Sequence, residues 1–310
     1  MTSQRAIRPA RETDSDSTAA LRWSPATAAA VMSSSLDISL HDYDQAPKFL
    51  QGNPFIRHGY RAYLSPQLCV KSMFWWTNET LNIWTHLCGL TFFVLLLLYD
   101  ATFVMPHYQV SSFDCLVVSV TMFSMFMSTA YHVFGCHSER AYKMWLAWDL
   151  TGVSFSIFAI FLSGIYYAFS CFPFWQSVYT VSVACVFGAA VRMAFEPKLL
   201  SEEYQWRRLA IYCTWVVYGI VPTVHWIYLS GGLEKPIVQL LLPRVLIMYL
   251  ICGLAFFFYV SHYPERLCPG ILDFVGASHQ LWHILIIFAF YWWHNTGLIY
   301  IQIRNHYVCT

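Results

Sequence analysis

The chain has 310 residues, of which 57% are hydrophobic, 18% aromatic and only 11% charged. This composition excludes an ordinary soluble domain and is typical of a protein that crosses a membrane several times. Because the formal net charge is only +1, charge gives no reason to expect nucleic acid as a partner. The 10 cysteines have no regular spacing, which indicates neither a disulfide scaffold nor a thiolate zinc site.

The first part of the chain precedes any membrane-length apolar run. Residues 1–40 are rich in Ser, Thr and Ala and show no sustained hydrophobic period, so we expect a disordered cytoplasmic tail. Residues 41–77 have a mixed composition, and within them the stretch 64–76 is expected to form a helix along the membrane surface. Asn78 and Glu79 are expected to cap the first long helix that follows.

From residue 78 onward the sequence consists of apolar runs separated by short loops. Seven runs are long enough, or almost long enough, to cross about 30 Å of hydrocarbon. They lie at 80–99, 113–134, 147–170, 173–193, 209–229, 244–261 and 277–301. We therefore predict an all-α membrane protein in which residues 78–305 form a seven-transmembrane helix bundle, followed by a short lumenal tail at 306–310.

Lys and Arg predict the orientation, because basic residues near helix ends are retained on the cytoplasmic side. If the N-terminus is inside, eight of the 18 basic residues precede the first run on the inner side. The three inner loops that follow hold two, four and one basic residues, and the outer segments hold the remaining three. We predict a cytoplasmic N-terminus and a C-terminus that is lumenal or outside. Cys171 and Cys309 would then lie on the same outer side. They could form a disulfide there or remain two free thiols.

Polar residues of three runs share one depth near the cytoplasmic side once this orientation is fixed. His279 and His283 stand four residues apart in SHQLWH at the start of the seventh run, so a helix presents both on one face. His132 lies at the end of the second run with Ser128 one turn before it, and Asp149 lies at the start of the third run. Ionisable residues inside a membrane are costly, which makes this convergence a hypothesis for a functional site.

The residue types indicate a metal. Three neutral imidazoles are typical ligands of catalytic zinc, with the fourth position left for water. Asp149 would accept a hydrogen bond or a proton from that water, and Ser128 would orient the water or a ligand. Imidazole ligands favour zinc over calcium or magnesium, with iron, nickel and copper as alternatives. A cluster of His and Asp hydrogen bonds that joins the three helices without metal is the structural alternative. His86 is expected either beside the site or in helix packing.

These motifs resemble those of the progestin and adipoQ receptor family. The resemblance covers about residues 43–295, with NPFIRHGYRAYL, SMFWWTNETLNIWTHLCG, STAYHVFGCHSE, WDLTG, IVPTVHW, PER and SHQLWH in the family's order. It implies that His132, His279 and His283 are zinc ligands, that Asp149 lies near the zinc water, and that Ser128 is the serine of the S-x-x-x-H motif. It also implies a cytoplasmic N-terminus.

Further stretches, among them YDQAPKFLQGNPFIRHGYRAYLSPQLCVKS and YWWHNT, resemble the branch of this family that traps Raf kinase at the Golgi. The resemblance implies a multi-pass Golgi membrane scaffold whose N-terminal region, especially 41–77, holds Raf kinase and damps signalling from Raf to the MAP-kinase cascade. One alternative is a zinc-dependent, ceramidase-like lipid amidohydrolase, which would bind ceramide or a free fatty acid and use Asp149 and Ser128. The other is a receptor of the progestin and adipoQ type, for which the short outer loops provide no docking module.

Overall fold

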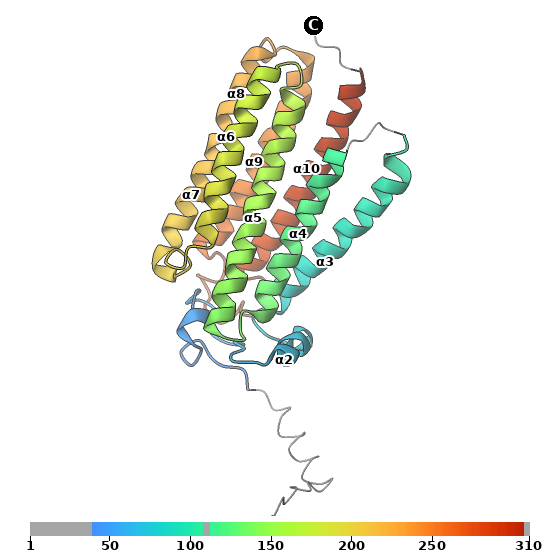
Figure 1. Cartoon of the computed structure of the whole chain (residues 1–310). Coiled ribbons are helices and arrows are strands. Elements are labelled where there is room, and N and C mark those ends of the chain that lie inside the picture. Colours follow the sequence, from blue (N-terminus) through green and yellow to red (C-terminus); the bar gives the residue numbers. More distant parts are fainter. Residues whose placement is uncertain (1–38, 108–111, 307–310) are drawn as a thin grey trace, which may run out of the picture. The chain divides into compact units, whose positions relative to one another are not determined.

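The computed structural model describes residues 39–107 and 112–306, and within these ranges the regular structure is helical apart from one bridge between His41 and Tyr60. The predicted all-α fold is therefore confirmed. The residues from Leu40 onward form one compact unit. Its long helices, shown in Figure 1, are α3 (Thr80–Tyr99), α4 (Ser112–Phe134), α5 (Glu139–Ala168), α6 (Pro173–Ala194), α7 (Gln205–Tyr218), α8 (Ile220–Leu229), α9 (Pro236–Ser261) and α10 (Ser278–His306). Apart from residues 39, 40 and 306, the two predicted tails lie outside the described residues.

Six helical stretches of the described chain are long and apolar enough to cross a membrane. They are Thr80–Val104, Glu139–Ala168, Pro173–Ala194, Gln205–Leu229, Pro236–Ser261 and Ser278–Ile303. Helix α4 has 23 residues, which corresponds to about 34 Å of helix, and it packs against both α3 and α5. A seventh span at α4 and the sides on which the termini lie stay predictions.

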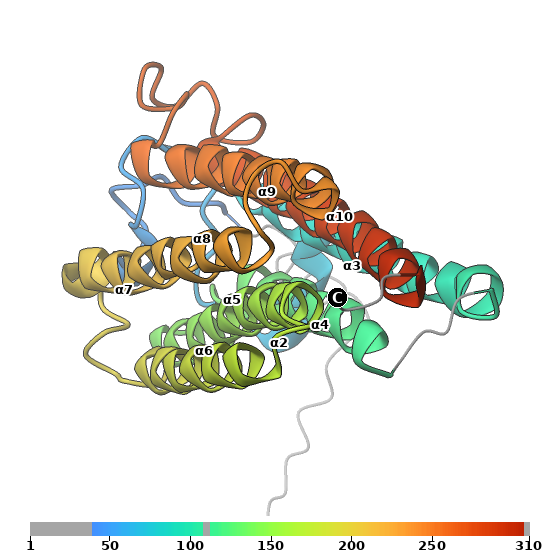
Figure 2. The same ribbon diagram turned by 90° about the horizontal axis from the view of Figure 1, so that it is seen from above.

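The helices pack mainly against their neighbours in the chain. Helix α5 lies between α4 and α6, α9 pairs with α10, and α3 packs against α4 and α10 (Figure 2). The largest apolar cluster gathers aromatic residues at the end of α5 that is remote from α2 (Pro66–Lys71), including Tyr167, Phe169, Trp215 and Trp226. This end of the bundle is therefore filled by apolar side chains.

Several helix boundaries differ from those predicted; α9, for example, begins at Pro236, eight residues before its predicted run. Helix α5 begins at Glu139, eight residues before the predicted run, because the Ser138 side chain caps it by accepting a hydrogen bond from the Ala141 N–H. Asp149 therefore lies ten residues inside the helix rather than in its first two turns. The predicted surface helix at 64–76 was too long, since only α2 and a 3-10 turn at Ser72–Phe74 form there.

The predicted run at 209–229 is interrupted at Gly219, between α7 and α8. A Cβ atom at this position would lie 2.3 Å from the Phe161 ring and 2.4 Å from the Tyr249 hydroxyl. Only glycine allows the backbone to approach the neighbouring side chains this closely.

Residues 41–77, called the N-terminal segment below, fold against the loop between α9 and α10. Asp273 of that loop is almost completely buried and accepts hydrogen bonds from the backbone N–H groups of Arg57 and His58, both at 2.9 Å. The His58 ring nitrogen Nδ1 also lies 2.7 Å from the Asp273 carboxylate. A buried carboxylate is tolerated only when it is paired in this way, so the N-terminal segment is part of the folded bundle.

Candidate metal centre

Glu265, in the loop before α10, fixes where that helix begins. Its buried carboxylate accepts hydrogen bonds from the Ser278 N–H at 2.7 Å, the Ser278 hydroxyl at 2.5 Å and the Asn53 side-chain amide at 3.0 Å. The Gln280 side chain accepts a further bond from the Gly276 N–H at 2.7 Å. Because these contacts satisfy donors at the helix start, the first turn of α10 has a fixed direction, and this turn carries His279.

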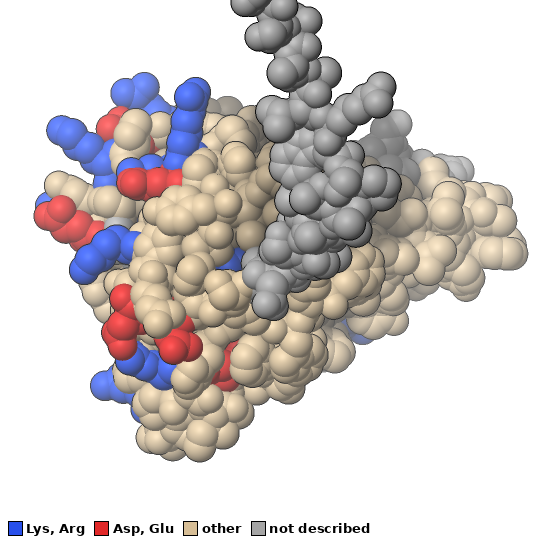
Figure 3. Space-filling view, turned by 90° about the horizontal axis from the view of Figure 1, so that it is seen from below, with Lys and Arg blue, Asp and Glu red and all other residues tan. Residues whose placement is uncertain are grey.

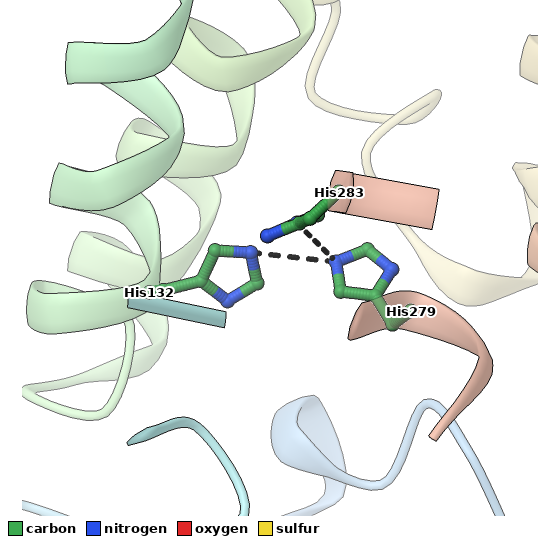
Figure 4. A group of neighbouring side chains, drawn as sticks. All are labelled: His132, His279 and His283. Atoms are coloured by element: carbon green, nitrogen blue, oxygen red, sulfur yellow. Dashed lines mark hydrogen bonds between the residues drawn. The ribbon is translucent and has the colours of Figure 1, made fainter. Parts of the chain in front are cut away.

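Three histidines converge at this point. His132 lies in the last turn of α4, and His279 and His283 lie in the first two turns of α10 (Figure 4). The His279 Nε2 atom is 3.3 Å from the Nε2 atom of His132 and 3.2 Å from that of His283. His132 and His283 are buried, and His279 is partly buried. The structure thus brings together the three histidines that the sequence placed at one depth.

The other ring nitrogens of two of these histidines face acceptors of the protein. His132 Nδ1 lies 2.8 Å from the Glu79 carboxylate, and His283 Nδ1 lies 3.2 Å from the Asn82 carbonyl and 3.0 Å from the Thr85 hydroxyl. A carboxylate and a carbonyl only accept hydrogen bonds, so each Nδ1 carries the proton. Each Nε2 then presents a lone pair, and these lone pairs face one another.

This donor set fits zinc. Two nitrogen ligands of a tetrahedral zinc ion, each about 2.0–2.1 Å from the metal, lie about 3.3–3.4 Å apart. The two Nε2 separations of 3.3 and 3.2 Å are close to this value. Converging lone pairs without protons between them repel one another unless a cation lies among them, which makes His132, His279 and His283 a candidate metal centre.

Glu79 has a different role from the one predicted. It occupies the N-cap position of α3 but makes no side-chain cap hydrogen bond. Its carboxylate instead accepts hydrogen bonds from His132 Nδ1 at 2.8 Å and from the Asn82 amide at 2.7 Å. Burial opposes ionisation, but the interactions with His132 and Asn82 outweigh it and lower the pKa of Glu79 to about 2. A carboxylate that accepts a hydrogen bond from the nitrogen facing away from the metal orients a metal-binding imidazole and raises its basicity.

Arg61 supports the same histidine through the backbone, and sequence reasoning had assigned it no role. Its buried guanidinium donates to the His132 carbonyl at 2.6 Å and to the Ser72 hydroxyl at 2.5 Å. Carbonyls in the last turn of a helix have no partner within the helix. Arg61 therefore holds the end of α4 against the N-terminal segment.

Ser128 and Asp149, the two residues predicted to assist the metal, lie next to each other. Ser128 is buried on α4, one turn before His132, and its hydroxyl interacts with the partly buried Asp149 carboxylate of α5. Asp149 also lies close enough to His132 for the two groups to interact electrostatically. The pair thus stands beside the candidate centre and could hold or move a proton there.

His86 lies directly behind His283. The two rings stack with centroids 3.7 Å apart and an angle of 17° between their planes. His86 is 5% exposed, and neither of its ring nitrogens has a hydrogen-bond partner within the described residues. Of the two roles considered for His86, the structure supports a place beside the centre.

An apolar cavity of about 140 Å³ lies elsewhere in the bundle, between α5, α7, α8, α9 and α10. Phe161, Trp226, Met248 and Trp293 are among its lining residues, whereas none of the three histidines lines it. The cavity and the candidate centre are therefore separate features of the structure.

The helices and the site define a multi-pass membrane protein in which three buried histidines face one another near one end of a helix bundle. Haemolysin-III related proteins match this chain over residues 74–294. Progestin and adipoQ receptor family member 3 of Homo sapiens is 43% identical over 277 residues, which are 88% of this chain and 89% of that protein. Heptahelical transmembrane protein 1 of Arabidopsis thaliana is 29% identical, over 87% of this chain and 83% of that protein.

The chain belongs to the Haemolysin-III related family, the family of the progestin and adipoQ receptors. The resemblance inferred from the motifs is thereby confirmed. Progestin and adipoQ receptor-like protein 1 of Caenorhabditis elegans is a further relative, 31% identical over 80% of this chain and 57% of that protein.

Proposed function

We propose that this protein is a zinc-containing scaffold of the Golgi membrane that holds Raf kinase through its N-terminal region and thereby damps signalling from Raf to the MAP-kinase cascade. In this proposal His132, His279 and His283 hold the zinc ion. Its support is the convergence of the three rings, in which His279 Nε2 lies 3.3 Å from His132 Nε2 and 3.2 Å from His283 Nε2. The Nδ1 atoms of His132 and His283 face Glu79 and Asn82. Zinc that binds only the folded bundle stabilises it.

The proposal places the metal end of the bundle in the cytoplasm. Figure 3 looks onto this end, where Lys and Arg side chains are exposed beside acidic ones. The exposed basic residues include Arg140, Arg192, Lys198, Arg207 and Arg266. Cys171, in the loop at the other end of α5, is disulfide-bonded, which is consistent with an oxidising compartment on that side. Cys309, its predicted partner, lies outside the described residues.

The observation that carries the scaffold proposal is that the N-terminal segment is a folded surface rather than a loose tail. Buried Asp273 and Glu265 bind it to the loop before α10, and Arg61 binds it to α4. Its outer face leaves several side chains free for a partner, with Tyr63 at 69% and Phe74 at 75% exposure. A folded surface of exposed aromatic and basic side chains suits the docking of a protein partner.

Exposed side chains of this face provide the test, because deleting the whole segment would also remove partners of buried carboxylates. A combined variant, Lys48→Glu, Tyr63→Ala, Lys71→Glu and Phe74→Ala, alters four exposed side chains. On overexpression we expect the unaltered chain, but not this variant, to move Raf kinase to the Golgi. Phe174→Ala, at a side chain 70% exposed near the opposite end, is the matched control. Raf recruited equally by the variant and the control would contradict the proposal.

A zinc-dependent lipid amidohydrolase is the second candidate function, and the interaction of Ser128 with Asp149 beside the centre favours it. When bound, zinc would polarise the substrate carbonyl and acidify a water molecule. Asp149 would accept the proton of that water and deliver it to the leaving amine, while Ser128 would orient the carboxylate. A ceramide-like lipid or its fatty-acid product would occupy the site. The names of the relatives also suggest a receptor, but no observation here favours it over these two.

Fatty-acid release from ceramide by the purified protein tests this second function. We expect Asp149→Asn to abolish release while leaving the zinc content unchanged. Asp149 does not belong to the group of side chains proposed to bind the metal, which consists of His132, His279 and His283. Thr214→Ala, at a position where the hydroxyl bonds only its own helix, is a control in the same bundle. Equal rates for the unaltered chain and Asp149→Asn would exclude the proposed role of Asp149.

A further inference from the structure

Two cysteines that have no part in the proposed function lie in contact near the end of α4. Cys69 belongs to α2, and Cys136 follows α4 by two residues. Their side chains are buried, with exposures of 0% and 5%, and their sulfur atoms are 3.7 Å apart. Both are free thiols. The Cys69 sulfur lies 3.6 Å from the Leu64 carbonyl oxygen, and the Cys136 sulfur lies 3.6 Å from the Val133 carbonyl oxygen.

The surroundings favour reaction at Cys136. A hydrogen bond with the Cys69 thiol lowers the pKa of Cys136, against the effect of burial, and the charge of Arg61 lowers the pKa of both thiols. Hydrogen bonding to Cys136 and burial raise the pKa of Cys69. The pair therefore combines a thiol whose pKa is lowered with a second thiol in contact with it, which is the arrangement of an attacking and a resolving cysteine.

We propose that Cys69 and Cys136 form a redox-active dithiol site that a hydroperoxide converts into an intramolecular disulfide. In the first step the Cys136 thiolate attacks a peroxide oxygen, the O–O bond breaks, and a sulfenic acid and hydroxide form. In the second step the Cys69 sulfur attacks the Cys136 sulfur, the S–O bond breaks, and the Cys69 proton leaves with the hydroxyl group as water. With hydrogen peroxide, two thiols and one peroxide give one disulfide and two waters.

The geometry requires little movement for this step. The sulfurs need to approach by about 1.7 Å to reach the S–S bond length of about 2.05 Å. The N-terminal segment supplies this freedom, because Cys69 belongs to a helix of only six residues. Tyr63, close before it, has a positive φ of 55°, a strained conformation for an aromatic residue, and its N–H donates to the Cys136 carbonyl at 2.7 Å. Such short, irregular elements open locally more readily than the long helices do.

The disulfide would fasten the N-terminal segment covalently to the chain one turn beyond His132. In the reduced protein the same junction depends on hydrogen bonds, chiefly those from Arg61 to the His132 carbonyl and from Tyr63 to the Cys136 carbonyl. The oxidised state would therefore keep the segment on the bundle under conditions in which the reduced state releases it.

Mass spectrometry of the purified full-length chain tests the proposal without any substitution. The protein is treated with hydrogen peroxide, its remaining thiols are alkylated, and it is digested without reduction. We expect a cross-linked pair of peptides containing Cys69 and Cys136, two hydrogens lighter than the reduced pair and lost after treatment with dithiothreitol. Separate alkylation of both cysteines, oxidation to sulfinic acid, or a disulfide to another cysteine would overturn the proposal.

Thermal unfolding supplies the second measurement. Oxidation should raise the unfolding temperature of the unaltered chain, and dithiothreitol should reverse the rise. Cys69→Ser and Cys136→Ser should each remove this response, whereas Cys268→Ser, at a free cysteine in the loop before α10, should keep it. A rise that persists in Cys69→Ser would contradict the assignment of this pair.

Discussion

Replacement of Glu79 by Gln is expected to weaken zinc binding at the candidate centre. Glu79 accepts a hydrogen bond from His132 Nδ1 at 2.8 Å, and this bond holds the imidazole with its Nε2 lone pair toward His279. Glutamine fills the same space and keeps an acceptor oxygen, but it has no negative charge. The substitution therefore removes the charge-assisted part of the hydrogen bond with little change in packing.

The size of the effect follows from the exposure of the carboxylate. Losing the hydrogen-bond partner of a metal-binding histidine costs about 10- to 100-fold in metal affinity. The Glu79 side chain is 33% exposed, so water screens part of its charge. We therefore expect the lower end of the range, about a 10-fold loss of zinc affinity, which corresponds to about 1.4 kcal/mol.

Competition against a zinc chelator, followed by elemental analysis of the purified protein, measures this change. Glu139→Gln is the matched control, because Glu139 is exposed, pairs only with Lys143 at 2.7 Å, and loses the same charge. An affinity that falls in Glu79→Gln but not in Glu139→Gln supports the reasoning. Equal affinity of Glu79→Gln and the unaltered chain would refute the idea that Glu79 tunes His132.

Three further substitutions test other parts of the site and its support. His132→Ala should leave the purified protein with almost no zinc by elemental analysis, whereas His225→Ala, at a histidine bonded to a tyrosine far from the centre, should keep it. Asp273→Ala should destabilise the bundle by roughly 2–4 kcal/mol, measured by thermal unfolding, because it removes the shared acceptor of the Arg57 and His58 N–H groups. Asp44→Ala, at an exposed carboxylate, should change stability by less than about 1 kcal/mol. Arg61→Met should lower both the unfolding temperature and the zinc affinity, because the His132 carbonyl loses its donor.

Local sequence patterns were sufficient to predict the histidines of the site. The spacing of His279 and His283 requires only a helix to place both rings on one face, and the helix forms from Ser278 onward. The spacing of Ser128 and His132 works in the same way on α4. The approach of α4 to α10 followed from the orientation of successive apolar runs, because alternate helix ends must lie at the same membrane face.

The residues that support the histidines could not be predicted in this way. Glu79 precedes a helix, so its position suggested a cap, and only the packing of α3 against α4 brings it to His132. Arg61 lies 71 residues from the carbonyl that it binds, and no periodicity links the two. Polar residues in irregular segments gain their roles from tertiary contacts, whose partners local patterns do not contain.

The N-terminal segment and the candidate centre form one structural unit, which bears on how their functions can be separated. Asn53 binds Glu265, which fixes the start of α10, and Arg61 binds the turn that carries His132. A metal that binds only the folded site therefore also stabilises the contacts of the segment. By the same linkage, removal of residues 41–77 would weaken the metal site as well as any docking surface. Substitutions at exposed side chains such as Tyr63 leave these contacts intact, so they separate partner binding from metal binding where a deletion does not.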